Sequence, residues 1–562
     1  MHTTESTPSA ARNRHAWLVA ATALLGAACV TGCGGGEQTP AAPSGKPAAR
    51  PIASGPNILW IVWDTVRRDH LGVYGYDRPT TPFLDEWSRQ ARVYTNCVSA
   101  GSSTVPSHGA MFTGLLPSEH GASNKHPQLD ERFDTIAELL HASGYDTYLF
   151  SANPHIARST KFAQGFEVAE HPWSEQYKKA AFEILRSKVD PRDQSNEIAR
   201  KVNRGASGGA MSEWNIKAAG PLAQQGLEAW LADRNSQRPY FAFLNYMEAH
   251  RHLMPSPEFR DRFLTPEEVE RNFKVDRTWK QTWGYVFGQA EYSEEELALT
   301  RKTYDACIAE LDDLLRRLLT SLEKRGALEN TIVIVTSDHG EHLGEHHLLD
   351  HQFSLYNELL YVPLIVKYPP AFPPGRDDKP VMSFDLFPTL LDLAGVAPPI
   401  DLQTQAIDLR RTPAQRKRLA EFPDWTDGPI QATLKNYPDF TPEVAARWQV
   451  RMRALYEGGR KFICASNGRR ELYDVAADPH ELTNLLVDHP EWCADRHAAL
   501  ASLLAKLRPL GQRESLGEMS PAEIEQLQAL GYAGGDEENA NEGAEDYCSC
   551  GSDASDEPAG GE

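Results

Sequence analysis

The sequence predicts an α/β fold, with a large, mostly parallel sheet between helices and a small antiparallel subdomain toward the C-terminal end. Short apolar runs alternate with segments of helical periodicity across residues 56–400, which is typical of parallel strands joined by helices. Several of these runs end in a carboxylate or a histidine, as expected where strand ends open on a site. After residue 446 the pattern changes to short strand-like segments separated by Gly-Gly and Asn-Gly turns.

The strands and helices are predicted in chain order from these patterns. The apolar run NILWIVWD (57–64) reads as a buried parallel strand, and FDTIAELLHASG (133–144) reads as a helix that leads into the strand YDTYLFSAN (145–153). A third strand is expected in RPYFAFLNYMEAH (238–250), and a helix with apolar residues at helical spacing is expected over 301–325, just before a glycine. The run TIVIVTSDHGE (331–341) gives a further strand. These elements make one sheet that is covered on both faces.

The remaining regions are less regular. Residues 170–234 are charged and helical in places, and residues 401–446 are polar and rich in proline. The segment RMRALYEGGRKFICASNGRRELYDV (451–475) predicts antiparallel strands joined by GG and NG turns. We therefore expect a catalytic domain over 56–400, a C-terminal subdomain over 401–535, and an acidic, disordered tail over 536–562.

Charge excludes one class of partner. The chain of 562 residues has a formal net charge of −21, and ten of its 78 acidic residues follow Gly535. The body that remains is still acidic, at about −11, which argues against nucleic acid as the main partner. An anionic substrate would need a locally positive pocket.

The N-terminus has the layout of an export signal. Two arginines precede the apolar run WLVAATALLGAACV, which is short for a spanning helix of about 20 residues. The ending V-T-G-C resembles a bacterial lipobox, with Cys33 as the lipidated residue, and an ordinary signal peptide or a signal anchor is the alternative. The Gly-, Pro- and Ala-rich residues 34–55 predict a flexible linker. We expect signal peptide 1–33 to direct a lipoprotein to the bacterial cell envelope, attached to the membrane through its lipid.

The cysteines do not suggest a metal site. Beyond the signal segment there are six cysteines, at positions 97, 307, 464, 493, 548 and 550, and they lack zinc-ligand spacing. In an exported protein they can include disulfides whose pairing the sequence does not reveal. Cys548 and Cys550 lie in the acidic tail, so we expect them to be solvated.

Polar residues at the ends of the apolar runs are candidates for a metal or oxyanion site. They are Asp64, His250, the pair Asp338-His339, and His351 in LLDHQFSLY. Each alone has a simpler explanation, since a carboxylate can cap a helix and a lone histidine is usually a satisfied surface or core residue. The adjacent pair Asp338-His339 is more specific, because carboxylate and imidazole are a common pair of metal ligands.

Motifs spread along the chain resemble the sulfatase family of the alkaline phosphatase superfamily. They include PNILWIVWDTVRRDHLGVYGY, TVPSHGAMFTGLLPSEHG, FLNYMEAH, IVIVTSDHGEHLGEHHLLDHQFSLYNELLYVPLIV and RRELYDVAADPHELTNLL, and they run in order from about Pro56 to Gly535. The resemblance implies an alkaline-phosphatase-like α/β sandwich with a small C-terminal subdomain. It also implies a divalent metal bound by Asp64, Asp338 and His339, with the nucleophile as a further ligand.

The departures from the family pattern decide the expected chemistry. Sulfatases carry Cys or Ser two residues before the proline of C/S-x-P-S-R and convert it to formylglycine, whereas this chain has Thr104. The β-carbon of threonine already bears a methyl group, so it cannot give that aldehyde. His108 stands at the arginine of the motif, and Thr65 replaces the second carboxylate of the usual Asp-Asp pair. A lysine of the family is missing from SANPH, where Asn153 and His155 fall nearby.

We therefore expect a metal-dependent hydrolase of sulfate or phosphate esters in which Thr104 is the nucleophile, activated by the metal. Pro106 and the helix that follows would present its hydroxyl, although Ser102, Ser103 and Thr104 could instead merely cap that helix. By resemblance, His250 acts on the leaving oxygen as general acid or oxyanion partner, and His351 holds a substrate oxygen. Phosphoesters or phosphonates are favoured, because water with metal help can clear a phosphothreonine.

Two other functions and several metals remain open. The first alternative is transfer of a phospho group to an envelope acceptor, and the second is a non-catalytic binding protein on the same fold. Joint retention of Asp64, Asp338, His339 and His250 argues against the second. An oxygen-rich site with one histidine admits calcium, magnesium or manganese, while more histidines favour zinc.

Overall fold

The structure is a computed structural model that describes residues 54–206, 216–234, 237–399, 405–508 and 547–548, all within the unit Arg50–Glu562. The expected signal peptide and Cys33 lie outside the described residues, as do most of the linker and most of the tail. Among the helices of the described residues, none combines the length and the apolar character needed to cross a bilayer.

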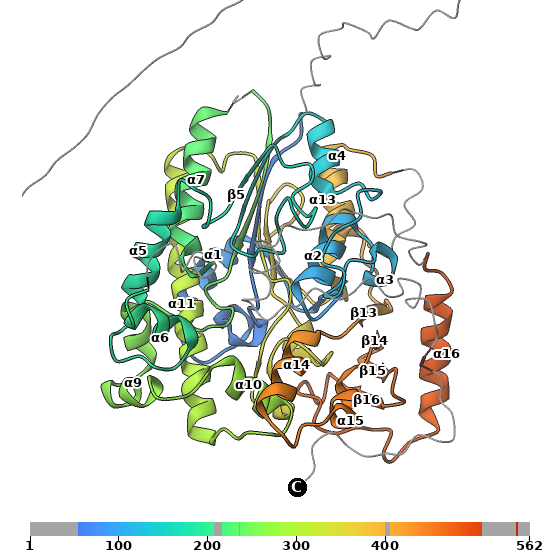
Figure 1. Cartoon of the computed structure of the whole chain (residues 1–562). Coiled ribbons are helices and arrows are strands. Elements are labelled where there is room, and N and C mark those ends of the chain that lie inside the picture. Colours follow the sequence, from blue (N-terminus) through green and yellow to red (C-terminus); the bar gives the residue numbers. More distant parts are fainter. Residues whose placement is uncertain (1–53, 207–215, 235–236, 400–404, 509–546, 549–562) are drawn as a thin grey trace, which may run out of the picture. The chain divides into compact units, whose positions relative to one another are not determined.

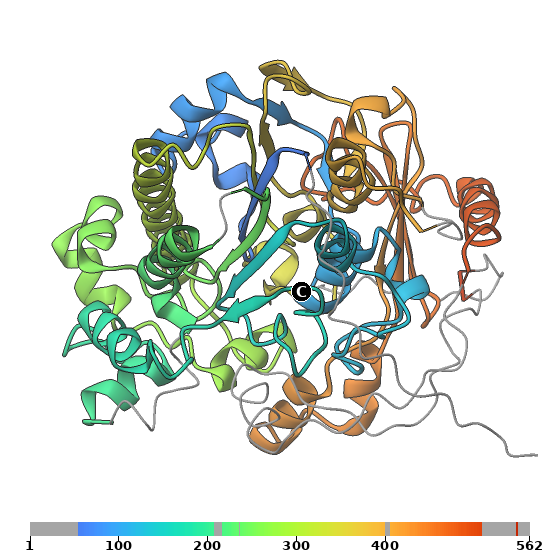
Figure 2. The same cartoon turned by 90° about the horizontal axis from the view of Figure 1, so that it is seen from above.

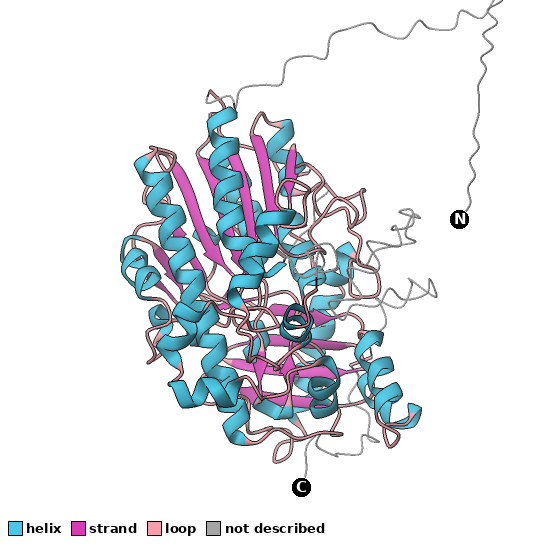
Figure 3. Ribbon diagram, turned by 60° about the vertical axis from the view of Figure 1, so that its left-hand side comes forward, coloured by secondary structure: helices cyan, strands magenta, loops and turns pink. Residues whose placement is uncertain are grey.

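Eight strands form the large sheet, in the order β11-β2-β10-β7-β1-β6-β4-β5. They are β1 (Asn57–Trp63), β2 (Arg92–Tyr94), β4 (Asp146–Ser151), β5 (Val168–Glu170), β6 (Tyr240–Tyr246), β7 (Thr331–Thr336), β10 (Leu364–Lys367) and β11 (Gly375–Asp377). Strands are magenta and helices cyan in Figure 3. β10 runs antiparallel to both of its neighbours, β7 and β2, whereas the other pairs are parallel. The mostly parallel sheet expected from the sequence is confirmed.

The register of the central strands brings their carboxyl ends to one edge. Val62 of β1 lies opposite Asn245 of β6 and Thr336 of β7. Ser151 of β4 lies opposite the same Asn245. The residues that follow β1, β7 and β4 therefore leave the sheet side by side, which is where ligands bind in such sheets.

Side chains of β1 alternate between two hydrophobic cores. Leu59, Ile61 and Trp63 pack in the core that contains residues of α7 (Ala219–Asp233) and α11 (Glu294–Lys324). The intervening residues of the strand pack on the opposite face with α2 (Thr104–Thr113), α4 (Ile136–Ala142) and α13 (Leu386–Ala394). Figures 1 and 2 show the sheet between these two sets of helices. Burial on both faces explains why the strand is a continuous apolar run.

Helix α11 begins earlier than the sequence pattern indicated. Ser293 caps it by accepting the backbone N–H of Glu296, whose side chain reaches back to the cap, so the helix starts at Glu294 rather than near residue 301. Three glutamates in its first turn also favour the positive end of the helix dipole. The insertion between β5 and β6 contains α5 (Lys178–Lys188), α6 (Glu197–Asn203) and α7.

A second sheet has the order β13-β14-β15-β16 and is fully antiparallel. Its strands are β13 (Arg418–Phe422), β14 (Met452–Glu457), β15 (Arg460–Ala465) and β16 (Arg470–Asp474). The Gly458-Gly459 turn has positive φ at both residues, 59° and 81°, as a tight hairpin requires. β13 was not predicted, because its five residues lie inside a segment that is otherwise polar.

Short elements complete the fold. The remaining helices are α1 (Pro82–Trp87), α3 (Pro117–His120), α8 (Pro257–Phe263), α9 (Pro266–Asn272), α10 (Trp279–Val286), α12 (Asn357–Leu360), α14 (Asp427–Asn436), α15 (Pro442–Ala445) and α16 (Trp492–Leu504). Two short ladders pair β3 (Cys97–Val98) with β12 (Val381–Met382), and β8 (His342–Leu343) with β9 (Leu349–Asp350).

A disulfide joins Cys464 of β15 to Cys548, 84 residues later. The backbone carbonyl of Tyr547 accepts a hydrogen bond from Arg470, and its ring lies 4.6 Å from the Arg453 guanidinium. The expectation of a fully solvated tail is therefore wrong at these two residues, because a covalent bond and a cation–π contact attach them to the C-terminal sheet. Cys97 and Cys307 are buried free thiols.

Candidate active site

Four side chains meet at the carboxyl edge of the large sheet. Asp64 follows β1, Asn153 follows β4, Asn245 lies near the end of β6, and Asp338 comes two residues after β7. All four are fully buried. The parallel register thus gathers residues that are far apart in sequence, as the strand-end pattern predicted for Asp64 and Asp338.

The carboxylate of Asp64 is held by two amides. Its Oδ2 accepts hydrogen bonds from Nδ2 of Asn153 at 2.8 Å and from Nδ2 of Asn245 at 3.2 Å. Its Oδ1 makes no hydrogen bond. Burial, with the nearby charge of Asp338, raises the pKa of Asp64 to about 6.

Asp338 and His339 point ligand atoms at the same place. Asp338 Oδ1 accepts the N–H groups of Thr65 at 3.3 Å and His339 at 2.9 Å, while Oδ2 lies 3.3 Å from His339 Nε2. Burial raises the pKa of Asp338 to about 6 and lowers the pKa of His339 to about 3. Nδ1 of His339 donates to the Gly340 carbonyl at 2.9 Å, so Nε2 of the neutral ring carries the lone pair.

These residues fit a divalent cation. One ligand atom each from Asp64, Asp338 and His339 lies within 4.8 Å of the others. Asp64 Oδ1, Asp338 Oδ2 and His339 Nε2 are buried without a hydrogen bond, and two buried carboxylates that face each other need a positive counterpart. We call these three residues the first ligand group; two oxygens and one nitrogen suit magnesium, manganese, calcium or zinc.

Thr104 lies beside the first ligand group. It is the first residue of α2, it is 1% exposed, and its Oγ1 accepts a hydrogen bond of 3.1 Å from Nδ2 of Asn153. The same Nδ2 donates to Asp64, so one amide links the Thr104 hydroxyl to a carboxylate of the first ligand group. Ser103 occupies the N-cap position but makes no side-chain capping bond, so capping does not explain this run of hydroxyls.

His108 supports the turn that carries Thr104. Its Nδ1 donates to the Thr104 carbonyl at 3.0 Å and lies 3.5 Å from Asp338 Oδ2. Burial lowers the pKa of His108 to about 3, so the ring is neutral near pH 7. His108 therefore contacts the backbone of the candidate nucleophile and a carboxylate of the first ligand group.

His250 is held by its own loop and by a buried lysine. Its Nδ1 donates to the Arg251 carbonyl at 2.6 Å, which leaves the buried Nε2 as a lone pair without a hydrogen bond. Burial lowers the pKa of His250 well below its ordinary value. Lys217 donates to the carbonyls of Met247, at 2.7 Å, and His250, which fixes the loop after β6.

His351 lies between His250 and His339, with ring centroids 5.0 Å and 4.6 Å away. Its Nδ1 is 2.9 Å from Asp350 Oδ1 and 3.4 Å from Glu341 Oε2. Oδ2 of the same aspartate accepts a hydrogen bond of 2.8 Å from the Arg251 guanidinium. We call Glu341, Asp350 and His351 the second ligand group.

All the site residues expected from the sequence within the described region thus gather in one place: the first ligand group, Thr104, His108, His250 and His351. The sequence places Asn153 only near the position of the missing lysine, and it indicates no role for Asn245, Arg251, Lys217 or Glu341. The dipeptide Asp-His at 350–351 repeats that at 338–339, but it also occurs at 69–70 and 488–489, so it does not by itself indicate the second ligand group.

A buried Asp, Asp and His at the carboxyl edge of a parallel sheet, next to a hydroxyl at a helix N-terminus, define an α/β metal-dependent ester hydrolase. The particular family follows from comparison with known proteins. The sulfatase family model matches residues 56–396, more than half of the chain, and the chain belongs to the sulfatase family. A model of the C-terminal part of N-sulphoglucosamine sulphohydrolase matches residues 344–508.

Individual relatives are distant but cover most of the chain. An N-acetylglucosamine-6-O-sulfatase of Bacteroides thetaiotaomicron is 23% identical over 503 residues, covering 76% of this chain and 82% of that protein. A choline-sulfatase of Rhizobium meliloti is 24% identical over 464 residues, covering 76% and 82%. The crystal structure of a phosphonate monoester hydrolase of Agrobacterium radiobacter superposes with a TM-score of 0.58 at 21% identity, covering 80% of this chain and 95% of that one. This likeness shows the α/β sulfatase fold, and family membership makes the chain a sulfuric or phosphoric ester hydrolase.

Proposed function

We propose that this enzyme hydrolyses phosphate or phosphonate monoesters, with Thr104 as the nucleophile. The observation that carries the proposal is the contact of Thr104 Oγ1 with Asn153, the amide that also holds Asp64. This contact supports the assignment, because it puts the Thr104 hydroxyl beside the first ligand group. Threonine cannot be converted to the aldehyde that clears a sulfated enzyme, whereas a phosphothreonine is cleared by attack of water at phosphorus.

The proposed reaction has two displacement steps. Thr104 Oγ forms a bond to phosphorus while the bond from phosphorus to the oxygen of the ester's organic group breaks, in a phosphate and in a phosphonate monoester alike. The proton of the threonine hydroxyl passes to solvent, and the departing oxygen takes up a proton and leaves as an alcohol. Water then attacks phosphorus, the Thr104–phosphorus bond breaks, one proton of the water passes to Thr104 Oγ to restore the hydroxyl, and phosphate or phosphonate is released. A divalent cation, when bound by the first ligand group, lowers the pKa of the hydroxyl and screens the anionic substrate.

The protein's own residues orient these steps. Asn153 fixes the direction of the Thr104 hydroxyl, and the N–H of His108 Nδ1 holds the carbonyl of the same residue. We assign His250 to the leaving oxygen, as general acid or oxyanion partner, and His351 to a substrate oxygen. Because Nδ1 of His250 donates to the Arg251 carbonyl, its Nε2 must take up a proton before it can give one.

The test is a pair of variants at one position. Thr104→Ala should lower kcat by about 10³-fold or more with the fold retained, and Thr104→Ser should keep substantial activity because the oxygen remains. Ser103→Ala is the matched control, since its hydroxyl reaches only Asn124, at 3.3 Å. The substrates are an aryl sulfate, a phosphate monoester, a phosphate diester and a phosphonate monoester, each with magnesium, manganese, calcium or zinc.

Two results would overturn the proposal. One is a Thr104→Ala enzyme with unchanged turnover. The other is a pair of findings. The wild type cleaves none of the phosphorus esters, and Thr104→Cys, produced together with a formylglycine-forming enzyme, cleaves a sulfate ester that the wild type does not. A phosphate trapped on the peptide that contains Thr104 would support it directly.

We further propose that the mature protein is a lipoprotein of the bacterial envelope, anchored through Cys33. The support is the V-T-G-C sequence and the Cys464–Cys548 disulfide, because disulfides persist in oxidising compartments. Mass spectrometry of the mature N-terminus checks it: a lipidated Cys33 is expected, and an unmodified cleavage elsewhere contradicts it.

A further inference from the structure

The second ligand group resembles a metal site that is separate from the first. Glu341, Asp350 and His351 are buried, with exposures of 4%, 3% and 1%, and one ligand atom from each lies within 4.8 Å of the others. The short ladder of β8 and β9 sets this geometry, since Asp350 of β9 pairs with His342, the neighbour of Glu341. The pairing of β8 with β9 therefore brings three donor side chains from two segments of the chain together.

The distances within the group suit coordination. His351 Nδ1 is 2.9 Å from Asp350 Oδ1 and 3.4 Å from Glu341 Oε2. Ligands about 2.1 Å from an ion are about 3.0 Å apart in an octahedron and about 3.4 Å apart in a tetrahedron. Asp338 Oδ2 and His339 Nε2 of the first ligand group are 3.3 Å apart, which is the same spacing.

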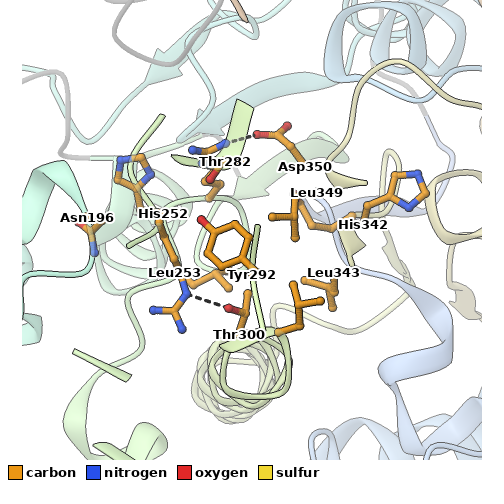
Figure 4. A pocket seen from close by; sticks show the side chains of 14 residues that line it. Asn196, His252, Leu253, Thr282, Tyr292, Thr300, His342, Leu343, Leu349 and Asp350 are labelled. Atoms are coloured by element: carbon orange, nitrogen blue, oxygen red, sulfur yellow. Dashed lines mark hydrogen bonds and ion pairs between the residues drawn. The ribbon is translucent and has the colours of Figure 1, made fainter. Parts of the chain in front are cut away.

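Two further observations point to a ligand at this place. The buried Nε2 of His250 has no hydrogen bond, and its ring faces that of His351 at 5.0 Å. A cavity of about 50 Å³ is lined by Glu341 and Asp350, with Arg251 and His252 beside them. Figure 4 shows Asp350 at its edge, paired with a guanidinium above Thr282. A cavity of this size admits the waters that complete the coordination of an ion.

The balance of charge in the second ligand group also favours a bound cation. Two buried carboxylates face one fixed cation, the Arg251 guanidinium, which pairs with Asp350 Oδ2 and lies 3.8 Å over the Trp279 ring. One negative charge is left to be balanced by a proton on Glu341, by a second proton on His351, or by a metal ion that replaces the Nδ1 proton. The adjacent nitrogens and the cavity favour the ion.

We propose that Glu341, Asp350 and His351 form a second divalent-cation site, next to the site of the first ligand group, so that the enzyme can hold two metal ions. His250 offers a further nitrogen, the buried Nε2 of a ring whose centroid is 5.0 Å from that of His351. Two oxygens and one or two imidazoles suit manganese or zinc. The site lies next to the cavity that Glu341 and Asp350 line, where a second cation would help to hold a doubly charged phosphoryl group. The catalytic role of this second site rests on the proposed function, whereas the number of ions that the chain binds does not.

The experiment counts metal ions in the full chain without substrate. Chelator-treated protein is titrated with Mn²⁺ alone, and the bound manganese is measured by equilibrium dialysis and elemental analysis. Wild type should bind two ions that are magnetically coupled in the electron paramagnetic resonance spectrum, because the groups are adjacent. Glu341→Gln, which keeps shape and removes a charge, should weaken the second ion at least tenfold and abolish the coupling while the first ion stays.

Controls keep the outcome decisive. Glu358→Gln is matched, because Glu358 is also a buried glutamate beside an imidazole, that of His480 at 3.1 Å, and it should leave both ions bound. Asp350→Asn is the second test variant if Glu341→Gln does not fold, as judged by thermal unfolding. One ion per chain in both wild type and Glu341→Gln would overturn the inference. A second ion that stays bound, without magnetic coupling to the first, in both Glu341→Gln and Asp350→Asn would also overturn it. Unchanged turnover in Thr104→Ala, together with two coupled ions in wild type, would overturn the proposed function and leave the metal inference standing by itself.

Discussion

The two ligand groups hold the same kinds of side chain, two carboxylates and a histidine, but in different electrostatic surroundings. In the first group the hydrogen-bond partners of Asp64 and Asp338 are side-chain amides and backbone N–H groups, and burial raises the pKa of both carboxyls to about 6. In the second group Arg251 and His351 hold the pKa of Asp350 well below its usual range although burial acts in the other direction.

This difference indicates how each group depends on metal. The first group has ligand atoms without partners and no neutralising side chain at hydrogen-bond distance from its carboxylates, so the folded protein needs the cation there. The second group is partly neutralised by Arg251, so it is tolerable without metal. We therefore expect tight binding in the first group and weaker, exchangeable binding in the second.

The largest expected effect comes from removing a ligand of the first group. Asp338→Asn should lose the tightly bound ion and lower kcat by more than about 10²-fold, because the carboxylate both binds the ion and faces His108. Elemental analysis and initial rates measure both effects. Binding of Mn²⁺ to the second group should persist, so loss of both ions together would show that the groups are one cooperative site.

The next effect concerns the stability of the second group. Asp350→Asn breaks the buried pair with Arg251 and should lower the free energy of unfolding by about 3 kcal/mol at pH 7. The pKa of Asp350 is lower in the folded state than in the unfolded state, so its contribution is present above the unfolded pKa and is lost as pH falls toward the folded one. Urea unfolding of metal-free protein at pH 7 and at about pH 2, well below the unfolded pKa of about 3.8, measures it. An unchanged midpoint at pH 7 would show that the pair contributes nothing.

A substitution in the first group should raise, rather than lower, the free energy of unfolding of the metal-free protein. In metal-free protein Asp64→Asn should raise the free energy of unfolding at pH 7 by roughly 2–3 kcal/mol, because the pKa of Asp64 is raised by burial from 3.8 to about 6. The folded state then holds a proton that the unfolded state releases, so this carboxyl costs stability as pH rises from about 4 to about 6. The gain should vanish near pH 4. With saturating metal the sign should reverse, and a gain that persists with metal would contradict a ligand role for Asp64.

Much of this arrangement was readable from the sequence, because it follows from local rules. The apolar runs 57–64 and 331–341 are long enough and pure enough to be buried parallel strands, and parallel strands bring their carboxyl ends together. Asp64 and the pair Asp338-His339 were therefore predictable as neighbours, although 274 residues separate Asp64 from Asp338. The family motifs added Thr104, His108, His250 and His351 to the same place.

What was not predictable depends on contacts that no local pattern encodes. Asn153 serves both Asp64 and Thr104 only because β4 lies beside β6 in the sheet. Arg251 reaches Asp350 from 99 residues away, and Cys464 reaches Cys548 across 84 residues. β13 was missed because five half-polar residues form a strand only when β14 pairs with them. Side-chain partners, unlike strand ends, are fixed by the packed structure.

The smallest effect would sharpen the comparison most, because it should turn the second group into a copy of the first. In Arg251→Met the guanidinium that neutralises Asp350 Oδ2 is removed, while the thioether can still lie against Trp279. Two buried carboxylates then face each other without a fixed cation, so a divalent ion has less positive charge to oppose it.

At an effective dielectric constant of about 20, removing one unit charge several ångströms away should tighten binding of the second Mn²⁺ by roughly tenfold or more. Titration of the chelated variant should show this tightening with the first ion unchanged, and its thermal midpoint should respond to Mn²⁺ more strongly than that of wild type. Weaker binding of the second ion would show that Arg251 orients Asp350 for the metal rather than competing with it, and that the two groups differ in geometry as well as in charge.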